Sequence, residues 1–194
     1  MTPYWVDNFD PFLVRFGGDW GIRYYGLAYV AAFAAGSLML RYLYRKGKSP
    51  LDGNAVSSVM LYLVIGVLIG GRLGYMLLYG WHTFVQNPLS IFMVWQGGMS
   101  SHGGFIGVAV ACYFSAKKTN LSFWTVSDLL CVVAPVGLFL GRIANFINGE
   151  LWGRVTTVPW AVIFPKSAPS GTPIELIVAR HPSQLYEALL EGLL

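Results

Sequence analysis

Four apolar runs in the sequence are long enough to cross a lipid bilayer, which takes about 20 mainly apolar residues. They cover residues 24–40, 55–78, 99–116 and 125–147. A fifth run begins near residue 183 and reaches residue 194 after only twelve residues, so we expect it to be the start of a further helix. This pattern predicts an all-α, polytopic integral membrane protein with four complete transmembrane helices, an incomplete fifth helix and a single membrane domain.

The polar segments between these runs predict the orientation. Basic residues collect at 41–48 and at 117–118, whereas the segment 79–98 contains no lysine or arginine. Because cytoplasmic loops carry an excess of Lys and Arg, we expect both basic loops in the cytoplasm and the N-terminus outside. The proline-containing segment 149–182 should then form a small external cap loop. The aromatic stretch 89–95 is expected to lie along the outer interface.

The composition supports a membrane protein and argues against a nucleic-acid-binding protein. Hydrophobic residues make up 55% of the 194 residues and charged residues only 11%, whereas soluble proteins carry roughly a quarter charged residues. The net charge of +4 does not indicate nucleic acid, because the basic residues lie in short turns instead of along one polar face. No cluster of metal-ligating residues occurs, so we expect a lipid bilayer as a partner and no cofactor.

Two arginines interrupt apolar runs at equivalent places. Gly-Arg, followed by an aliphatic and a small residue, occurs at 71–74 and at 141–144. Arg72 and Arg142 each lie 17 residues beyond the start of their run, which at 1.5 Å per residue is about 26 Å into a roughly 30 Å hydrocarbon core. The alternative is that each side chain extends to the nearby interface. It is weaker for Arg142, because three polar residues follow directly: Asn145, Asn148 and Glu150.

His102 is expected in the same outer layer, because it lies a few residues into a run that enters from the outside. An imidazole can accept a proton near neutral pH, and a guanidinium matches the oxygens of a phosphate. Glycines at four-residue spacing are typical of close helix packing, whereas Gly103 and Gly104 beside His102 can leave room for a substrate. A histidine that bonds a neighbouring carbonyl is the structural alternative. The residues alone predict a site for an anionic, phosphate-bearing lipid headgroup.

A transporter or channel with an arginine-lined anion site is the main alternative function. Transporters usually hold their sites near the bilayer midplane, at discontinuous helices, whereas the charges here are expected near the outer face. An intramembrane serine protease that uses Ser101 and His102 is excluded, because adjacent side chains on a helix point in different directions.

The most specific motif of the chain covers the end of the fourth apolar run and the residues after it. Gly-Arg-Ile-Ala-Asn-Phe-Ile-Asn-Gly-Glu-Leu-Trp-Gly-Arg at 141–154 closely resembles the signature of the prolipoprotein diacylglyceryl transferase family. Supporting matches are Trp-Gln-Gly-Gly-Met-Ser-Ser-His-Gly-Gly at 95–104, Gly-Gly-Arg-Leu-Gly-Tyr at 70–75, Tyr-Gly at 25–26 and Arg-His-Pro-Ser-Gln-Leu-Tyr-Glu at 180–187. The resemblance covers essentially all of the chain, in the order of the family. Because family members continue through two further helices, one of which carries a second essential arginine, it implies a C-terminally truncated chain.

The resemblance implies an activity, substrates and site residues. The implied reaction transfers a diacylglyceryl group from phosphatidylglycerol to the lipobox cysteine in the signal peptide of a prolipoprotein, forms a thioether and releases glycerol phosphate at the bacterial inner membrane. It implies that Arg142 binds the headgroup and that His102 is important for catalysis. These two residues are the catalytic candidates. The candidate substrate-binding residues are Tyr25, Arg72, Gly103, Gly104, Asn145, Asn148, Glu150 and Gly153.

Overall fold

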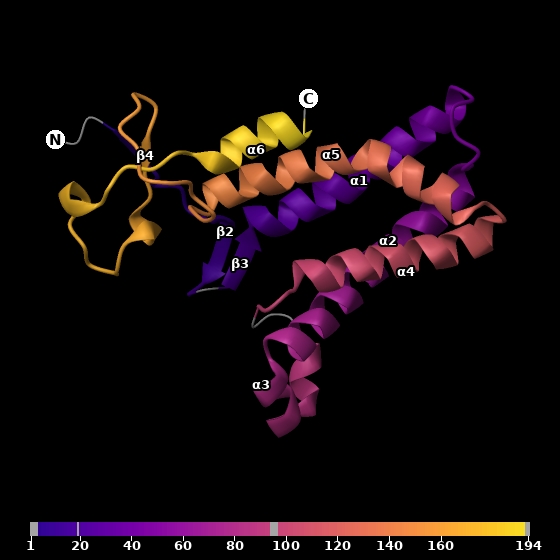
Figure 1. Ribbon diagram of the computed structural model, residues 1–194, viewed down its shortest axis with the longest axis horizontal. Helices are drawn as coiled ribbons and strands as arrows, with labels where there is room; N and C mark the ends of the chain where they lie inside the picture. Colours follow the sequence, from indigo (N-terminus) through magenta and orange to yellow (C-terminus); the bar gives the residue numbers. More distant parts are fainter. Residues whose placement is uncertain (1–3, 19, 94–96, 193–194) are drawn as a thin grey trace. The chain divides into compact units, whose positions relative to one another are not determined.

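The computed structural model describes residues 4–18, 20–93 and 97–192, which are mostly helical (Figure 1). The chain forms two compact units, one made of Met1–Gly36 with Val133–Leu194 and the other of Ser37–Val132. The longer helices are α1 (Tyr24–Arg45), α2 (Gly53–Leu78), α4 (Ser101–Thr119), α5 (Phe123–Ile147) and α6 (Ser183–Gly192).

Three helices among the described residues are long and apolar enough to cross a membrane: α1, α2 and α5. This finding supports the prediction of a helical membrane protein. Helix α4 has 19 residues and is not among the three, because glycines and polar residues occupy much of its length. A fourth complete span and the orientation therefore remain predictions. The fifth expected helix is α6, and residues 193–194 lie outside the described part.

Helices α2 and α4 pack along a stripe of glycines in the unit Ser37–Val132. A Cβ atom added to Gly107 would lie 1.9 Å from the carbonyl oxygen of Gly66, and one added to Gly70 would lie 2.4 Å from that of Gly103. Since lipid is as apolar as a leucine side chain, close backbone contact is what favours helix pairing in a membrane. The four-residue glycine spacing was predicted to serve packing, and these contacts confirm it for α2 and α4, whereas a Cβ atom on Gly141 of α5 would meet nothing within 4 Å.

The ends of these helices follow from local sequence. Asp52 caps α2, because its carboxylate accepts a hydrogen bond from the Ala55 amide at 2.7 Å. Helix α4 begins after Ser100 and ends at Asn120, which adopts the left-handed conformation (φ 54°). Short helices α3 (Trp81–Gln86) and η1 (Pro88–Phe92) connect α2 to α4. The predicted interfacial stretch 89–95 begins within η1, and residues 94–95 lie outside the described part.

In the other unit, α5 contacts the first part of α1 and the whole of α6 runs along it (Figure 1). A Cβ atom added to Gly137 would lie 3.7 Å from Ala32 of α1, and one added to Gly192 would lie 2.5 Å from Phe139. The N-terminal half of α1 and helix α6 therefore flank the C-terminal half of α5, where most of the predicted site residues lie.

The segment 149–182 was predicted to be a cap loop, and the structure gives it a small core of its own. Strand β1 (Trp5–Val6) pairs in parallel with β4 (Val162–Ile163). The short helices η3 (Pro165–Ser167) and η4 (Ile174–Leu176) complete the segment. Four buried residues form the core: Ala161, Ile163, Ile177 and Ala179. The β1–β4 pair joins residues more than 150 positions apart, so no local periodicity indicates it.

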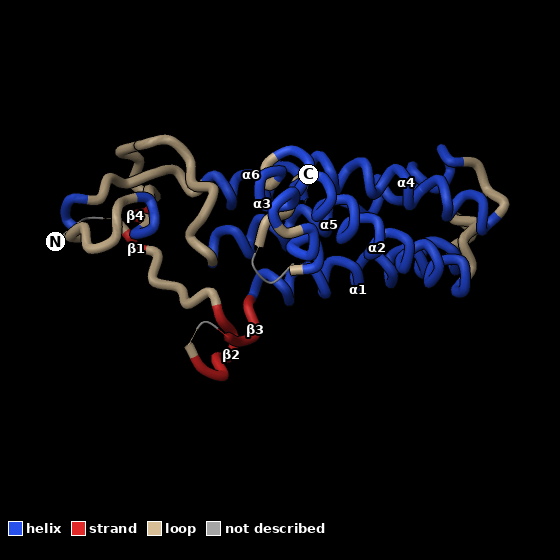
Figure 2. The backbone as a smooth tube through the Cα atoms, turned by 90° about the horizontal axis from the view of Figure 1, so that it is seen from below, coloured by secondary structure: helices blue, strands red, loops and turns tan. Residues whose placement is uncertain are grey.

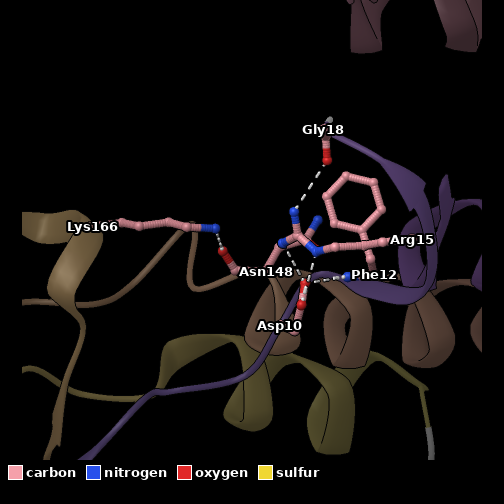
Figure 3. Close-up of polar contacts among 6 residues, drawn as sticks. All are labelled: Asp10, Phe12, Arg15, Gly18, Asn148 and Lys166. Atoms are coloured by element: carbon pink, nitrogen blue, oxygen red, sulfur yellow. Dashed lines mark hydrogen bonds and ion pairs between the residues drawn. The ribbon is translucent and has the colours of Figure 1, made fainter. Parts of the chain in front are cut away.

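A hairpin precedes α1 and is the second departure from the all-α prediction (Figure 2). Strands β2 (Phe12–Gly17) and β3 (Trp20–Arg23) pair antiparallel. Arg15 forms an ion pair with Asp10 at 2.8 Å (Figure 3), and this neighbour holds the pKa of the Asp10 carboxyl below its usual range. The guanidinium groups of Arg15 and Arg23 lie 4.3 and 4.5 Å from the Phe12 ring centre. Strand β2 has only six residues, and so short a run does not allow a strand to be distinguished from a loop in the sequence.

The glycine stripe leads to a stability prediction. Gly107→Ala should lower the free energy of unfolding by about 1–3 kcal/mol, because the added methyl forces α2 and α4 apart. Gly104→Ala is the matched control on the same helix, since a Cβ atom there meets nothing within 4 Å. Unfolding in detergent micelles, followed by circular dichroism, measures both. Equal stability of the two variants would contradict the packing role of Gly107.

Candidate functional site

Asn145, Asn148 and Glu150 form a polar cluster at the C-terminal end of α5. The side-chain amides of Asn145 and Asn148 both donate to Oε1 of Glu150, at 3.0 and 3.2 Å. The Glu150 amide in turn donates to the carbonyl oxygen of Asn145 at 3.1 Å. Asn145 is buried. The carboxylate of Glu150 is therefore held in one position by the helix that precedes it.

The turn that returns Glu150 onto the helix depends on Gly149. Its φ of +59° is in the left-handed region, as is usual for the residue that ends a helix. A Cβ atom on Gly149 would also meet the carboxylate of Asp7 at 2.6 Å. The Lys166 ammonium donates to the carbonyl oxygen of Asn148 (Figure 3), where a cation offsets the negative end of the helix dipole.

Tyr25 joins this cluster from α1. Its hydroxyl lies beside the Asn145 side chain and within the electrostatic influence of Glu150. Its ring packs against Tyr29 with 5.2 Å between the ring centres. The first turn of α1, the last turn of α5 and the turn that follows it thus bring together Tyr25, Asn145 and Glu150, three of the predicted residues.

Gly153 is held by backbone contacts. Its amide donates to the carbonyl oxygen of His181 at 2.9 Å, and a Cβ atom would lie 2.9 Å from that same oxygen. Next to it, the Gln184 side chain donates to the carbonyl oxygen of Glu150. The two motifs at 141–154 and 180–187 are therefore in direct contact, and the requirement for glycine at 153 has a steric explanation.

Arg142 contacts two carboxylates of α6. Its Nη2 atom lies 2.7 Å from Oε2 of Glu187 and 3.7 Å from Oε2 of Glu191. Sequence reasoning did not identify either glutamate as a site residue. The available signal was their four-residue spacing in the sequence, which places both on one face of a helix.

Arg72 is buried in the unit Ser37–Val132, with 5% of its surface exposed. A guanidinium has five N–H donors, and every one of them is directed at a backbone carbonyl. The acceptors are the carbonyl oxygens of Ser90, Ile91, Met93, Gly97 and Gly98. All five donors of Arg72 are therefore engaged by the backbone, and its substrate-binding role stays a prediction.

His102 is the second residue of α4 and is exposed. Ser100 caps the helix, its hydroxyl accepting from the Gly103 amide at 3.3 Å, and its own amide donates to the carbonyl oxygen of Gly71 at 2.9 Å. Gly103 packs on α2, where a Cβ atom would lie 2.2 Å from the carbonyl oxygen of Gly70. Gly103 therefore serves helix packing, whereas Gly104 borders open space. Trp95 and Gln96, which begin the motif at 95–104, lie outside the described residues.

The predicted residues thus fall into two groups. Six of them belong to the unit that contains the end of α5, and four belong to the unit Ser37–Val132. Because His102 and Arg142 lie in different units, their predicted meeting stays a prediction. The six are Tyr25, Arg142, Asn145, Asn148, Glu150 and Gly153, and the four are Arg72, His102, Gly103 and Gly104.

Comparison with known proteins adds independent evidence. The profile of the family described as prolipoprotein diacylglyceryl transferase matches residues 11–194. Similar proteins described as phosphatidylglycerol–prolipoprotein diacylglyceryl transferases occur in Solidesulfovibrio magneticus (52% identical over 95% of this chain and 67% of that protein) and in Idiomarina loihiensis (48%, over 98% and 69%). Another occurs in Coxiella burnetii (46%, over 96% and 68%). The chain spans about two thirds of the length of these relatives. With a match that includes every motif around the end of α5, the chain belongs to the prolipoprotein diacylglyceryl transferase family.

Proposed function

We propose that the chain transfers the diacylglyceryl group of phosphatidylglycerol to the lipobox cysteine of a prolipoprotein. The observation that carries this proposal is the family match over residues 11–194, because it includes the segment 141–154 that the structure builds into one polar cluster with Arg142 beside it. The relatives are named for the same donor lipid and acceptor protein. The alternative, a transporter or channel, has no support among these matches.

The reaction forms a carbon–sulfur bond and breaks a carbon–oxygen bond. The cysteine thiolate attacks the glyceryl carbon that carries the phosphate ester, and glycerol phosphate leaves with the bonding electrons. A free thiol has a pKa near 8.5, so a base must remove its proton. His102 is exposed in the first turn of α4 and takes this role in our proposal.

Arg142 is the arginine in this chain that we assign to the phosphate. Its partners are carboxylates, which are side chains that can move aside for another anion. A guanidinium placed at the leaving phosphate stabilises the charge that develops there as the bond breaks. Asn145, Glu150 and Tyr25 lie around the end of the same helix and are positioned to bind the glycerol hydroxyls of the headgroup.

We further propose a multi-pass inner-membrane protein with four spans, its N-terminus outside and its site at the outer leaflet. The pairing of β1 with β4 supports four crossings, because strands on one side of a membrane must be separated by an even number of spans. Three spanning helices, α1, α2 and α5, would place the two strands on opposite sides. Helix α4 then supplies the fourth crossing.

Cysteine labelling tests this topology. In a background without Cys112 and Cys131, Lys46→Cys should be protected from a membrane-impermeant thiol reagent on intact cells, and Ser170→Cys should react. Lysed cells should label at both positions, which controls for accessibility. Labelling of intact cells at position 46 alone would reverse the orientation.

Replacement by lysine should affect the two arginines, Arg142 and Arg72, differently. Arg142→Lys keeps the charge but loses the planar fork that fits a phosphate, so kcat/KM for phosphatidylglycerol should fall about 10²–10³-fold while the protein stays folded. Arg72→Lys supplies three donors in place of five, so it should lower the unfolding temperature in detergent. Activity assays and thermal unfolding of both variants measure this contrast. Wild-type activity of Arg142→Lys would remove Arg142 from the phosphate site.

The base role of His102 has a direct test. His102→Gln keeps a hydrogen-bonding side chain of similar size but cannot transfer the proton, so the rate should fall about 10²–10⁴-fold. His82→Gln, at another exposed histidine in α3, is the matched control and should leave the rate unchanged. Release of glycerol phosphate in the presence of a lipobox peptide measures both. A nearly fully active His102→Gln enzyme would exclude the base role.

A further inference from the structure

Two carboxylates of α6 contact the guanidinium of Arg142. Glu187 makes the shorter contact, 2.7 Å to Nη2, and Glu191 approaches the same nitrogen at 3.7 Å. Helix α6 is packed at both ends, since Gly192 contacts Phe139 closely and Gln184 is buried. The carboxylates are therefore part of the built site.

The charges around Arg142 prevent simple addition of a phosphate. One positive charge already faces two negative charges, so a third anion would meet net repulsion before it reached the guanidinium. A phosphate ester can therefore bind Arg142 only if a carboxylate moves away from the guanidinium.

We propose that Glu187 is the resident counter-ion of Arg142, which the phosphate of the substrate displaces when the lipid binds. The inference rests on the proposed function and deepens it, because it makes Glu187 a positioning residue that sets the affinity of the site for phosphate esters. Glu187 keeps the arginine paired when no lipid is bound, and an unpaired arginine in a membrane protein is costly. On return to Arg142 it also helps expel glycerol phosphate.

The exposure of the pair suits an exchange. The Arg142 and Glu187 side chains are 27% and 35% exposed, and screening by solvent keeps an ion pair at such a position weak. An ion pair of this strength holds the arginine in place but can be displaced by an anion with more oxygen atoms. A fully buried pair would cost too much to separate.

The test measures the affinity of the enzyme for glycerol phosphate as a probe. Glu187→Gln removes the competing charge, so the inhibition constant of glycerol phosphate should fall about fivefold, and the KM for phosphatidylglycerol should fall with it. Glu191→Gln is the graded comparison, because its contact is longer and it should lower the inhibition constant less than Glu187→Gln does. Glu187→Asp keeps the charge and should stay close to the wild type. Glycerol phosphate should also raise the unfolding temperature of Glu187→Gln more than that of the wild type.

The outcomes separate this inference from the proposed function. An unchanged or higher inhibition constant in Glu187→Gln, with the wild type active, overturns the counter-ion role alone. If Glu187→Gln is too unstable for the activity assay, the rise in its unfolding temperature on addition of glycerol phosphate is the test. A rise no larger than that of the wild type overturns the proposal. A wild-type enzyme that neither transfers the lipid group nor binds the probe would overturn the proposed function itself. A gain in anion affinity is a result that a purely structural glutamate would not produce.

Discussion

Five carbonyl groups between Ser90 and Gly98 converge on the guanidinium of Arg72. Ser90 lies in η1, whereas Met93, Gly97 and Gly98 belong to no helix or strand, and carbonyls buried without partners are costly. Arg72 supplies all five donors from one turn of α2. The chain can therefore leave α2, turn, and begin α4 at Ser100, whose amide is bonded to Gly71. The location of His102 and the glycine contacts of α4 both depend on this arrangement.

The two arginines show how the kind of partner decides what a cation can do. The partners of Arg72 are backbone carbonyls, which cannot leave without unfolding the segment that carries them. The partners of Arg142 are carboxylates at the tips of side chains, which can rotate away. Only the second arrangement can exchange one anion for another. In our proposal Arg72 therefore acts through structure, and Arg142 binds the ligand.

The contacts around the end of α5 explain why separate motifs belong to one site. The segment 180–187 supports the segment 141–154 through the bonds from Gly153 to His181 and from Gln184 to Glu150. Glu187, at the end of the same supporting segment, faces Arg142. One stretch of chain therefore supplies both the contacts that support the cluster and the counter-ion of its arginine.

The sequence by itself determined the membrane environment, the approximate bounds of the five main helices and the residues at the end of α5, because apolar runs and helix termini are local properties. Family resemblance selected Tyr25, Asn145, Glu150 and Gly153. Only the tertiary structure decided that β1 pairs with β4, that Gly103 packs on α2, and that Arg72 and Arg142 have different partners. Both arginines follow a glycine at the same depth of an apolar run, so nothing local separates them. Their roles depend on which distant segment returns to meet each one, and that is a property of the folded chain.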